Sequence, residues 1–154
     1  MGTMTNTNTL FSQLKVARTV PGDEDPAIDL TKTDLVKYLE SRDAKDLVLL
    51  EGKTPDWFVL DRLSTMTVAS LSDKALGLEL KAITAFLAGC HRIELSDGSV
   101  LEPTEYLPGN QAKVAKESWV NTVADEFGLP TIVEMGKLIL KISSLGKRSK
   151  KALF

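Results

Sequence analysis

The chain has 154 residues, a formal net charge of −2, 43% hydrophobic residues and 26% charged residues, which is the composition of an average soluble globular domain. A chain of this length buries enough surface to fold without disulfides or a structural metal. With one cysteine and one histidine, an internal disulfide, a zinc site of paired cysteines and most histidine-based catalysis are excluded. We expect one ordinary domain without a cofactor.

The net charge is divided unevenly along the chain. Residues 1–134 contain 13 Lys and Arg against 21 Asp and Glu, a balance of −8, whereas residues 135–154 contain six basic residues and no acid. Such an asymmetry is typical of electrostatic contact with an acidic partner: nucleic acid, another protein or the acidic face of a second copy. It is equally typical of a solvated tail that keeps a protein soluble.

The first 30 residues predict little regular structure. Residues 1–10 are rich in Thr and Asn and carry no charge, which is typical of a polar arm without a core of its own. Residues 10–20 mix helical and strand patterns and end at Pro21-Gly22, so we expect a short extended segment. The acidic residues 23–26 predict a solvated loop, because the spacing of a calcium-binding loop is missing.

A helix and a hairpin are expected next. Thr31 followed by Asp34 resembles a capping box, and the apolar spacing that follows predicts a helix over 31–42. The apolar run 47–50, a turn over 51–55 and the aromatic run 57–63 predict a β-hairpin or two neighbouring strands.

The second half of the chain is expected to be mainly helical. Ser64 or Thr65 begins a helical pattern that continues to Gly89, as one helix or as two joined near Ser72. Asp97-Gly98 between the short apolar runs 93–95 and 100–102 predicts a second hairpin. Two more helices are then expected, one over 110–127 that ends at Gly128, and one from Pro130 to Gly146 with a single apolar face.

The expected fold class is therefore α+β: a helix-dominated single domain with two short β-hairpins. We expect the domain over residues 11–146, with the polar N-terminal arm at 1–10 and a basic C-terminal tail at 147–154.

Nucleotide-dependent catalysis is not expected, because the ten glycines fall singly at turns and form no phosphate-binding loop. Cys90 and His91 are adjacent, so their side chains point apart in a helix or a strand. The pattern predicts a small buried thiol at a helix end and a polar histidine rather than a nucleophile and its base.

Acid pairs for two-carboxylate catalysis are available only because acids are abundant. Asp61 with Glu94, or Glu102 with Glu105, are more typical of solvated surface groups than of a cleft that separates their pKa values. We therefore expect a protein that is not an enzyme. An enzyme with dispersed acidic catalysts is the third alternative, after the two given below.

The C-terminal unit is the most informative feature for interaction. Its helix carries Lys137 and Lys141 on the polar side and precedes a basic segment that ends in two apolar residues. It could cap the core and end in a solvated tail, dock to another protein, or lie on nucleic acid or an anionic membrane. The tryptophans Trp57 and Trp119 are expected in the core, with an interface role as the alternative. The candidate interaction residues are Lys147, Arg148, Lys150, Lys151, Leu153, Phe154 and Trp57.

The segments 38–43 (YLESRD), 47–52 (LVLLEG) and 55–64 (PDWFVLDRLS) resemble small accessory proteins encoded in bacteriophage structural-gene clusters. The shared pattern is a short helix, an apolar strand, a turn with proline, an aromatic strand and a helix capped by Ser or Thr. The resemblance covers residues 35–90. It implies a non-enzymatic role in assembly, as a virion component or a tail-assembly factor, and it brings no functional residues.

The leading hypothesis is a non-enzymatic protein–protein interaction module, a phage virion or tail-assembly component whose termini contact neighbouring subunits in a homo- or hetero-oligomer. The alternative is a nucleic-acid-associated protein that binds through the basic C-terminal helix and tail. The start of the chain resembles no secretory signal, and no apolar stretch has the length of a transmembrane segment. We expect a cytoplasmic or virion location.

Overall fold

The computed structural model describes residues 13–73, 77–103 and 111–145. Within these ranges the chain forms five α-helices and two small antiparallel sheets, of four and two strands. The expected α+β class is confirmed. The polar arm at 1–10 and the basic tail at 147–154 lie outside the described residues.

The strands and helices alternate irregularly along the chain. The strands are β1 Gln13–Val16, β2 Thr19–Val20, β3 Asp23–Glu24, β4 Trp57–Asp61, β5 Cys90–Glu94 and β6 Val100–Leu101. The α-helices are α2 Leu35–Ser41, α3 Thr65–Asp73, α4 Leu78–Gly89, α5 Gln111–Phe127 and α6 Leu129–Ser144, and a short 3-10 helix, η1, spans Ala44–Asp46.

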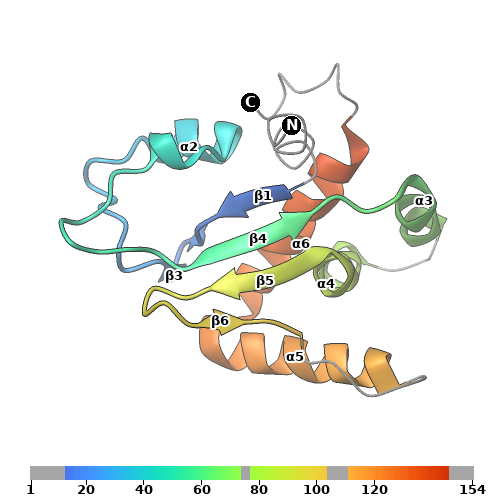
Figure 1. The fold of residues 1–154 in the computed structure, drawn as a ribbon. Coiled ribbons are helices and arrows are strands. Elements are labelled where there is room, and N and C mark those ends of the chain that lie inside the picture. The colour runs from blue at the N-terminus through green and yellow to red at the C-terminus, as the bar shows by residue number, and fades with distance from the viewer. Residues whose placement is uncertain (1–12, 74–76, 104–110, 146–154) are drawn as a thin grey trace, which may run out of the picture.

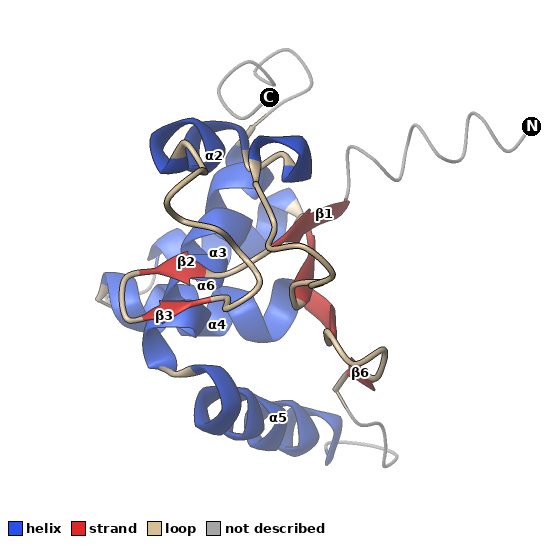
Figure 2. Cartoon of the chain, turned by 90° about the vertical axis from the view of Figure 1, so that its left-hand side faces the viewer, coloured by secondary structure: helices blue, strands red, loops and turns tan. Residues whose placement is uncertain are grey.

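The four-stranded sheet has the order β1-β4-β5-β6, and each neighbouring pair is antiparallel. Helices α4 and α6 pack on one face of it (Figure 1). The side view shows β1 on one side of the molecule and α3, α4 and α6 on the other, with α2 at the top and α5 at the bottom (Figure 2). Phe58, Leu60 and Ile93 belong to the main core beneath these helices. The other face carries charged side chains, including Lys15 and Glu94, whose Nζ and Oε1 atoms are 2.9 Å apart.

Helices α4 and α6 pack with their backbones in contact. A Cβ atom at Gly136 of α6 would overlap the backbone carbonyl of Ala82 in α4. One at Gly89 would lie 2.7 Å from Cγ2 of Ile139. Small residues at both points allow this approach, as at other close helix crossings. The position of α6 on the sheet therefore depends on glycine at position 136.

Aromatic rings fill the core between the sheet and the helices. The Phe86 and Trp119 rings stack at 5.4 Å between centroids, and Phe127 meets Phe58 edge-on at 5.2 Å. These are the favoured geometries for aromatic pairs. Trp119 is buried, so its expected place in the core is confirmed.

Elements with strong local signals form as expected. Gly98 adopts a φ of 92° in the turn between β5 and β6, and Oδ1 of Asp97 accepts a hydrogen bond from the Ser99 amide. Gly128 ends α5 with a φ of 88°, and Pro130 lies in the first turn of α6. The apolar face expected on this last helix is buried: Ile132, Met135, Leu138, Ile139 and Ile142.

The strand predicted over 47–50 is wrong. Only Leu49 forms a β-bridge, with Ile28, and the expected pairing with 57–63 does not occur. Both edges of β4 are already occupied, by β1 and by β5, so no position beside it is free. Leu47 is buried against Tyr38 in a second, smaller apolar cluster, and residues 48–50 remain exposed.

The acidic loop predicted over 23–26 is also wrong. Asp23 and Glu24 form β3, which pairs with β2 across the Pro21-Gly22 turn. Asp25 is buried, and its carboxylate is satisfied there by hydrogen bonds from the backbone amides of Ala27 and Asp56.

The helix predicted over 31–42 is shorter than expected. Its cap is Asp34, which accepts a hydrogen bond from the Lys37 amide, so α2 begins at Leu35. The hydroxyl and amide of Thr31 instead donate to the carboxylate of Asp29 in the preceding turn.

The helical pattern from Ser64 to Gly89 forms two helices, α3 and α4. Oγ of Ser64 accepts from the Thr67 amide, as expected of a cap. Helix α3 ends at Asp73, next to the junction predicted near Ser72, but the cap of α4 is Gly77 rather than Ser72 or Asp73.

The close contact of α4 with α6 gives the first testable prediction. We expect Gly136→Ala to lower the free energy of unfolding by about 2 kcal/mol, because the added methyl group meets a backbone carbonyl that cannot rotate away. Thermal or urea denaturation measures the loss. The control is Gly77→Ser, which adds side-chain atoms to open space at a helix cap and should leave stability unchanged or slightly higher. Equal stability of Gly136→Ala and the wild type would contradict the packing described.

Candidate binding groove

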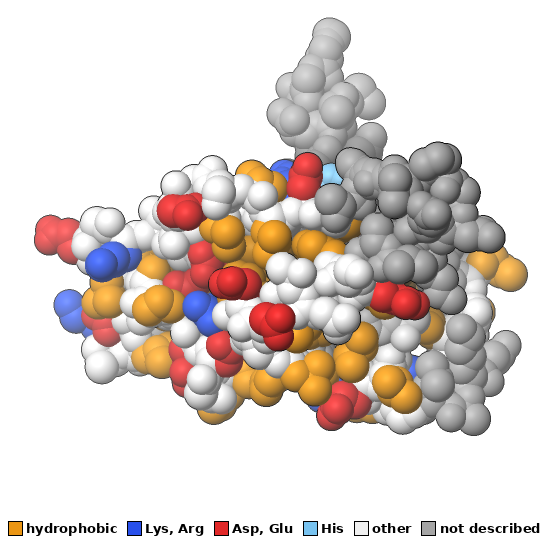
Figure 3. Space-filling model, turned by 90° about the horizontal axis from the view of Figure 1, so that it is seen from below, with side chains coloured by type: hydrophobic (Ala, Val, Ile, Leu, Met, Phe, Trp, Pro, Cys, Tyr) orange, Lys and Arg blue, Asp and Glu red, His pale blue; other side chains and the backbone are white. Residues whose placement is uncertain are grey.

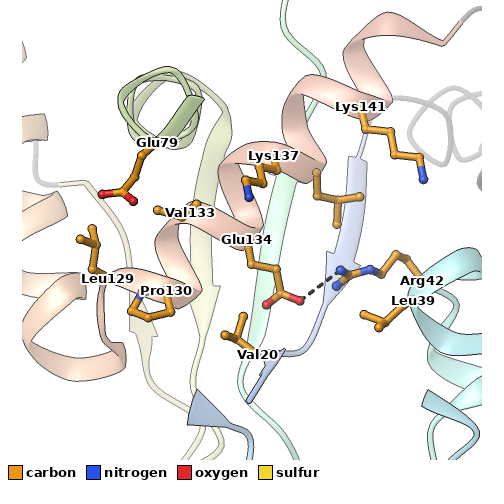
Figure 4. A pocket seen from close by; sticks show the side chains of 11 residues that line it. Val20, Leu39, Arg42, Glu79, Leu129, Pro130, Val133, Glu134, Lys137 and Lys141 are labelled. Atoms are coloured by element: carbon orange, nitrogen blue, oxygen red, sulfur yellow. Dashed lines mark hydrogen bonds and ion pairs between the residues drawn. The ribbon is translucent and has the colours of Figure 1, made fainter. Parts of the chain in front are cut away.

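A groove of about 540 Å³ lies along α6, on the side of the helix that faces away from the sheet (Figure 4). Glu79 of α4 flanks it on one side, and Leu39 and Arg42 at the end of α2 flank it on the other. Val20 of β2 lies at its lower edge in this view. The groove is thus formed by four elements from distant parts of the sequence, and its volume lies in the range of ligand-binding pockets.

The wall of the groove is mainly apolar. Leu39 and Leu129 are 38% and 43% exposed, and both line this hollow, so they belong to one exposed apolar wall. The remaining apolar lining residues are Val20, Pro130, Val133 and Leu138. An exposed apolar wall with charged neighbours is characteristic of interaction sites.

A buried ion pair connects α2 with α6 inside the groove. Nη2 of Arg42 lies 3.0 Å from Oε2 of Glu134, and the two side chains are only 10% and 11% exposed. Oγ1 of the buried Thr19 also donates to Oε2 of Glu134, at 2.9 Å. Glu134 therefore ties α6 to both α2 and β2, and the wall of the groove depends on this carboxylate.

Arg42 ends α2 with its backbone in a left-handed conformation. Its φ of 51° lies in the left-handed region, which non-glycine residues rarely adopt, and its amide donates to the carbonyl of Tyr38 to close the helix. The guanidinium lies 5.6 Å from the centroid of the Tyr38 ring. Its buried Nε and Nη1 atoms find no hydrogen-bond acceptor in the described part of the chain.

The rim of the groove carries Lys137 and Lys141. Both are exposed, and their spacing of four residues places them on the same side of α6. Within residues 13–73, 77–103 and 111–145, neither forms an ion pair. The acid across the groove, Glu79, lies in the first turn of α4, where a negative charge is stabilised by the helix dipole. The rim is therefore positive on the side of α6.

A second polar cluster positions the start of α6. Nη1 of Arg18 lies 2.8 Å from Oδ1 of Asp23, and the guanidinium lies 5.0 Å from the centroid of the Phe127 ring. The hydroxyl of Thr131 donates to Asp23. Because the helix cap, Gly128, has no side chain, Asp23 supplies the negative charge that the N-terminus of a helix favours. The β2–β3 hairpin is thereby held against α6.

The hollow beside Cys90 and His91, about 330 Å³, is less suited to chemistry. Burial raises the pKa of the Cys90 thiol, and Sγ faces the carbonyl of Arg92 at 3.8 Å. His91 points the other way, is exposed, and places Nδ1 3.5 Å from Oδ2 of Asp61. The predictions of a buried thiol at a helix end and of side chains that point apart are confirmed, although His91 lies in a strand.

Asp61 and Glu94, one of the acid pairs available in the sequence, have separate partners in the structure. Glu94 accepts from Lys15 and from Arg92, and these hydrogen bonds lower its pKa. Asp61 instead lies beside His91. Glu105, the predicted partner of Glu102, lies outside the described residues.

A third hollow, of about 300 Å³, lies over Asp25 and Asp56. Burial raises the pKa of Asp25, although its two backbone hydrogen bonds and the nearby Arg18 act in the opposite direction. Both carboxylates accept backbone hydrogen bonds, Asp25 from the Asp56 amide and Asp56 from the Ser96 amide. They hold three loops together, which is a structural role.

Most of the interaction residues predicted from the sequence lie outside the described residues: Lys147, Arg148, Lys150, Lys151, Leu153 and Phe154. Trp57 is described. It begins β4, is half-buried and packs against the small cluster around Tyr38 and Leu47. Its interface role stays a prediction.

Only part of the groove could be predicted from the sequence. Lys137 and Lys141 were expected on the polar side of the last helix, and Glu134 shares that side at a spacing of three and seven residues. No local signal pointed to Arg42, because its partner Glu134 is 92 positions away.

The face seen from below carries mainly hydrophobic and acidic side chains, intermixed (Figure 3). In the described ranges, no three His, Cys, Asp or Glu side chains are grouped so that they could hold a metal ion. Among the described helices, none combines the length and apolar composition needed to cross a bilayer.

Comparison of the chain with models of protein families, with curated proteins and with solved structures finds no match.

The Arg42–Glu134 pair gives a prediction about stability. Glu134→Leu leaves a buried cation without its partner, and we expect a loss of about 3 kcal/mol in the free energy of unfolding. The double variant Arg42→Met with Glu134→Leu should recover more than half of this loss, because no uncompensated charge remains. Urea denaturation of the single and double variants completes the cycle.

The control for this cycle is Lys45→Ala, which removes an exposed ion pair with Asp43 and should change stability by less than about 0.5 kcal/mol. Strictly additive effects of the two groove substitutions would show that Arg42 and Glu134 do not act as a pair.

Proposed function

We propose that the chain is a non-enzymatic protein-interaction module that takes part in an assembly and binds its partner in the groove along α6. The observation that carries the proposal is the groove itself, which has an exposed apolar wall and a buried ion pair. On its rim lie two lysines that form no ion pair with any residue that the structure describes. Protein interfaces combine an apolar centre with a polar, charged rim in the same way.

The apolar wall supports binding rather than packing within the chain. Leu39 and Leu129 lie at the surface although the core of the domain is filled by other side chains. Covering them in a complex removes apolar surface from water at about 25 cal/mol per Å², which favours association. Well-packed side chains near the centre of a patch are the ones that make such binding sensitive to mutation.

The reactive groups of the described residues support a role without catalysis. The Cys90 thiol is buried and its pKa is raised, so little of the nucleophilic thiolate forms. The buried carboxylates of Asp25, Asp56 and Glu134 accept hydrogen bonds that hold backbone or arginine in place. Each of these groups has a structural partner that explains its position.

The assembly that we propose is a bacteriophage virion or tail, with the chain in the cytoplasm of the infected cell or in the virion. This part rests on the resemblance of residues 35–90 to phage accessory proteins, and on the unlike termini, one polar and one basic.

The proposal is tested with the tagged full-length chain isolated from the cells that make it. Leu39→Asn with Leu129→Asn should lower the recovery of its partner subunits by at least about tenfold, because the loss of a well-packed anchor typically costs about 2 kcal/mol. Quantitative mass spectrometry measures recovery, and light scattering after size exclusion measures the mass of the complex.

The matched control is Met66→Asn, which removes a side chain that is 78% exposed on α3 and does not line the groove. It should leave recovery unchanged. Equal recovery with the groove variant and the wild type would refute the site, and a strictly monomeric chain that recovers no partner would refute the function.

The exposed lysines of α6 favour one second candidate, a nucleic-acid-associated protein that uses Lys137 and Lys141 together with the basic residues that follow in the sequence. It predicts salt-dependent binding to DNA or RNA. Replacing Lys147, Arg148, Lys150 and Lys151 with alanine should lower the slope of log affinity against log salt by about four, one for each charge removed. Absence of binding by the wild type in 50 mM salt would exclude this candidate.

A further inference from the structure

We infer that the groove along α6 binds a protein segment in which acidic side chains flank large apolar ones. Lys137 and Lys141 form ion pairs with these acidic side chains. The inference rests on the proposed function and adds the chemistry of the partner. Its evidence is the distribution of charge and apolar surface around the groove.

The charges of the groove leave a positive excess along α6. Arg42 and Glu134 neutralise each other at 3.0 Å, and Glu79 lies where the dipole of α4 stabilises it. Lys141 lies in the last turn of α6, where the dipole of that helix favours a cation, but Lys137 lies in the middle of the helix and gains nothing from it. The charge of Lys137 is therefore stabilised neither by a helix end nor by an acidic partner among the described residues.

The α2 end of the groove contributes no free positive charge. Nη2 of Arg42 donates to Glu134, and Nε and Nη1 of this guanidinium are buried, so they are not accessible to a partner in the groove. The positive charge that an anionic partner can reach is therefore that of Lys137 and Lys141 on α6.

The apolar wall determines what kind of anion fits. Val20, Leu39 and Leu129 surround the space between the charged groups, so a ligand that carries only charge would leave this wall exposed to water. A small molecule is also a poor match, because binding pockets usually enclose most of their ligand and this wall is at the surface. A protein segment can cover the wall with apolar side chains and place carboxylates at the lysines.

A nucleic acid fits the groove less well than an acidic protein segment. The apolar wall offers the bases no stacking surface, because none of its lining residues is aromatic. Charge and wall together favour the acidic, apolar protein segment.

The test selects peptides from a random 12-residue library on the immobilised full-length protein. The wild type should enrich peptides that place Asp or Glu next to Leu, Ile or Phe. A labelled peptide of the enriched composition should bind at least tenfold more weakly to Lys137→Glu with Lys141→Glu, and more weakly to the wild type when salt rises from 50 to 500 mM.

Two controls distinguish specific contacts of Lys137 and Lys141 with the acidic side chains of the peptide from a general effect of net charge on binding. Lys32→Glu with Lys53→Glu changes the net charge by the same amount on exposed lysines that do not line the groove, and it should bind as the wild type does. Lys137→Arg keeps the positive charge and should retain binding. Thermal denaturation of each variant confirms that it is folded.

Other outcomes would overturn the inference. Enriched peptides without acids, or equal binding by the groove and control lysine variants, would refute the acidic partner. A 30-nucleotide DNA that displaces the peptide and binds more tightly would assign the lysines to nucleic acid instead. If partner recovery depends on Leu39 and Leu129 but not on the lysines, the proposed function stands and this inference fails.

Discussion

The approach of α6 to α4 at Gly136 is the contact on which the rest of the structure depends. Because no Cβ separates Gly136 from the backbone of Ala82, α6 lies close enough to contact α3, α4, α5 and three strands. One side of the helix then faces the core with Ile132, Met135 and Ile139. The spacing of 3.6 residues per turn places Glu134, Lys137 and Lys141 on the opposite side, so the groove follows from the same packing.

The wall opposite α6 is held by charge rather than by a large apolar contact. Helix α2 has seven residues, too few to be stable alone, and buries only Tyr38. The Arg42–Glu134 pair adds the long-range connection. The free energy needed to remove two charges from water cancels much of their attraction, so the pair contributes little net stability. What it contributes is position: it sets where Leu39 lies relative to α6, and hence how wide the groove is.

Most of the secondary structure could be predicted from the sequence, because its signals are local. Asp97-Gly98 specifies a turn that needs a positive φ, and Gly128 with Pro130 ends one helix and starts the next within three residues. The run 47–50 shows the limit of such signals. It has strand composition, but whether it pairs depends on whether β4 has a free edge, and β1 and β5 occupy both.

The groove was less predictable than the fold for the same reason. The lysines of α6 were visible as a polar face, but the apolar wall comes from Val20 and Leu39, which reach α6 only through tertiary packing. The left-handed backbone of Arg42 is equally hidden: the sequence predicts that the helix ends at this residue, but an arginine does not signal a φ of 51°. Long-range pairs of this kind leave no periodicity to detect.

The structure changes the meaning of the charge division along the chain. The acidic excess of residues 1–134 is partly internal: Asp23 and Asp56 lie against Arg18, and Glu134 against Arg42. Arg18 and Arg42 thus pair with acids from residues 1–134, at buried sites where each electrostatic attraction is stronger. Lys137 and Lys141 come after the last acid in the sequence and lie on the side of α6 that faces away from the core. Neither lysine has an acidic partner among the described residues. In the function that we propose, the apolar wall beside them determines which anionic partner can use their charge.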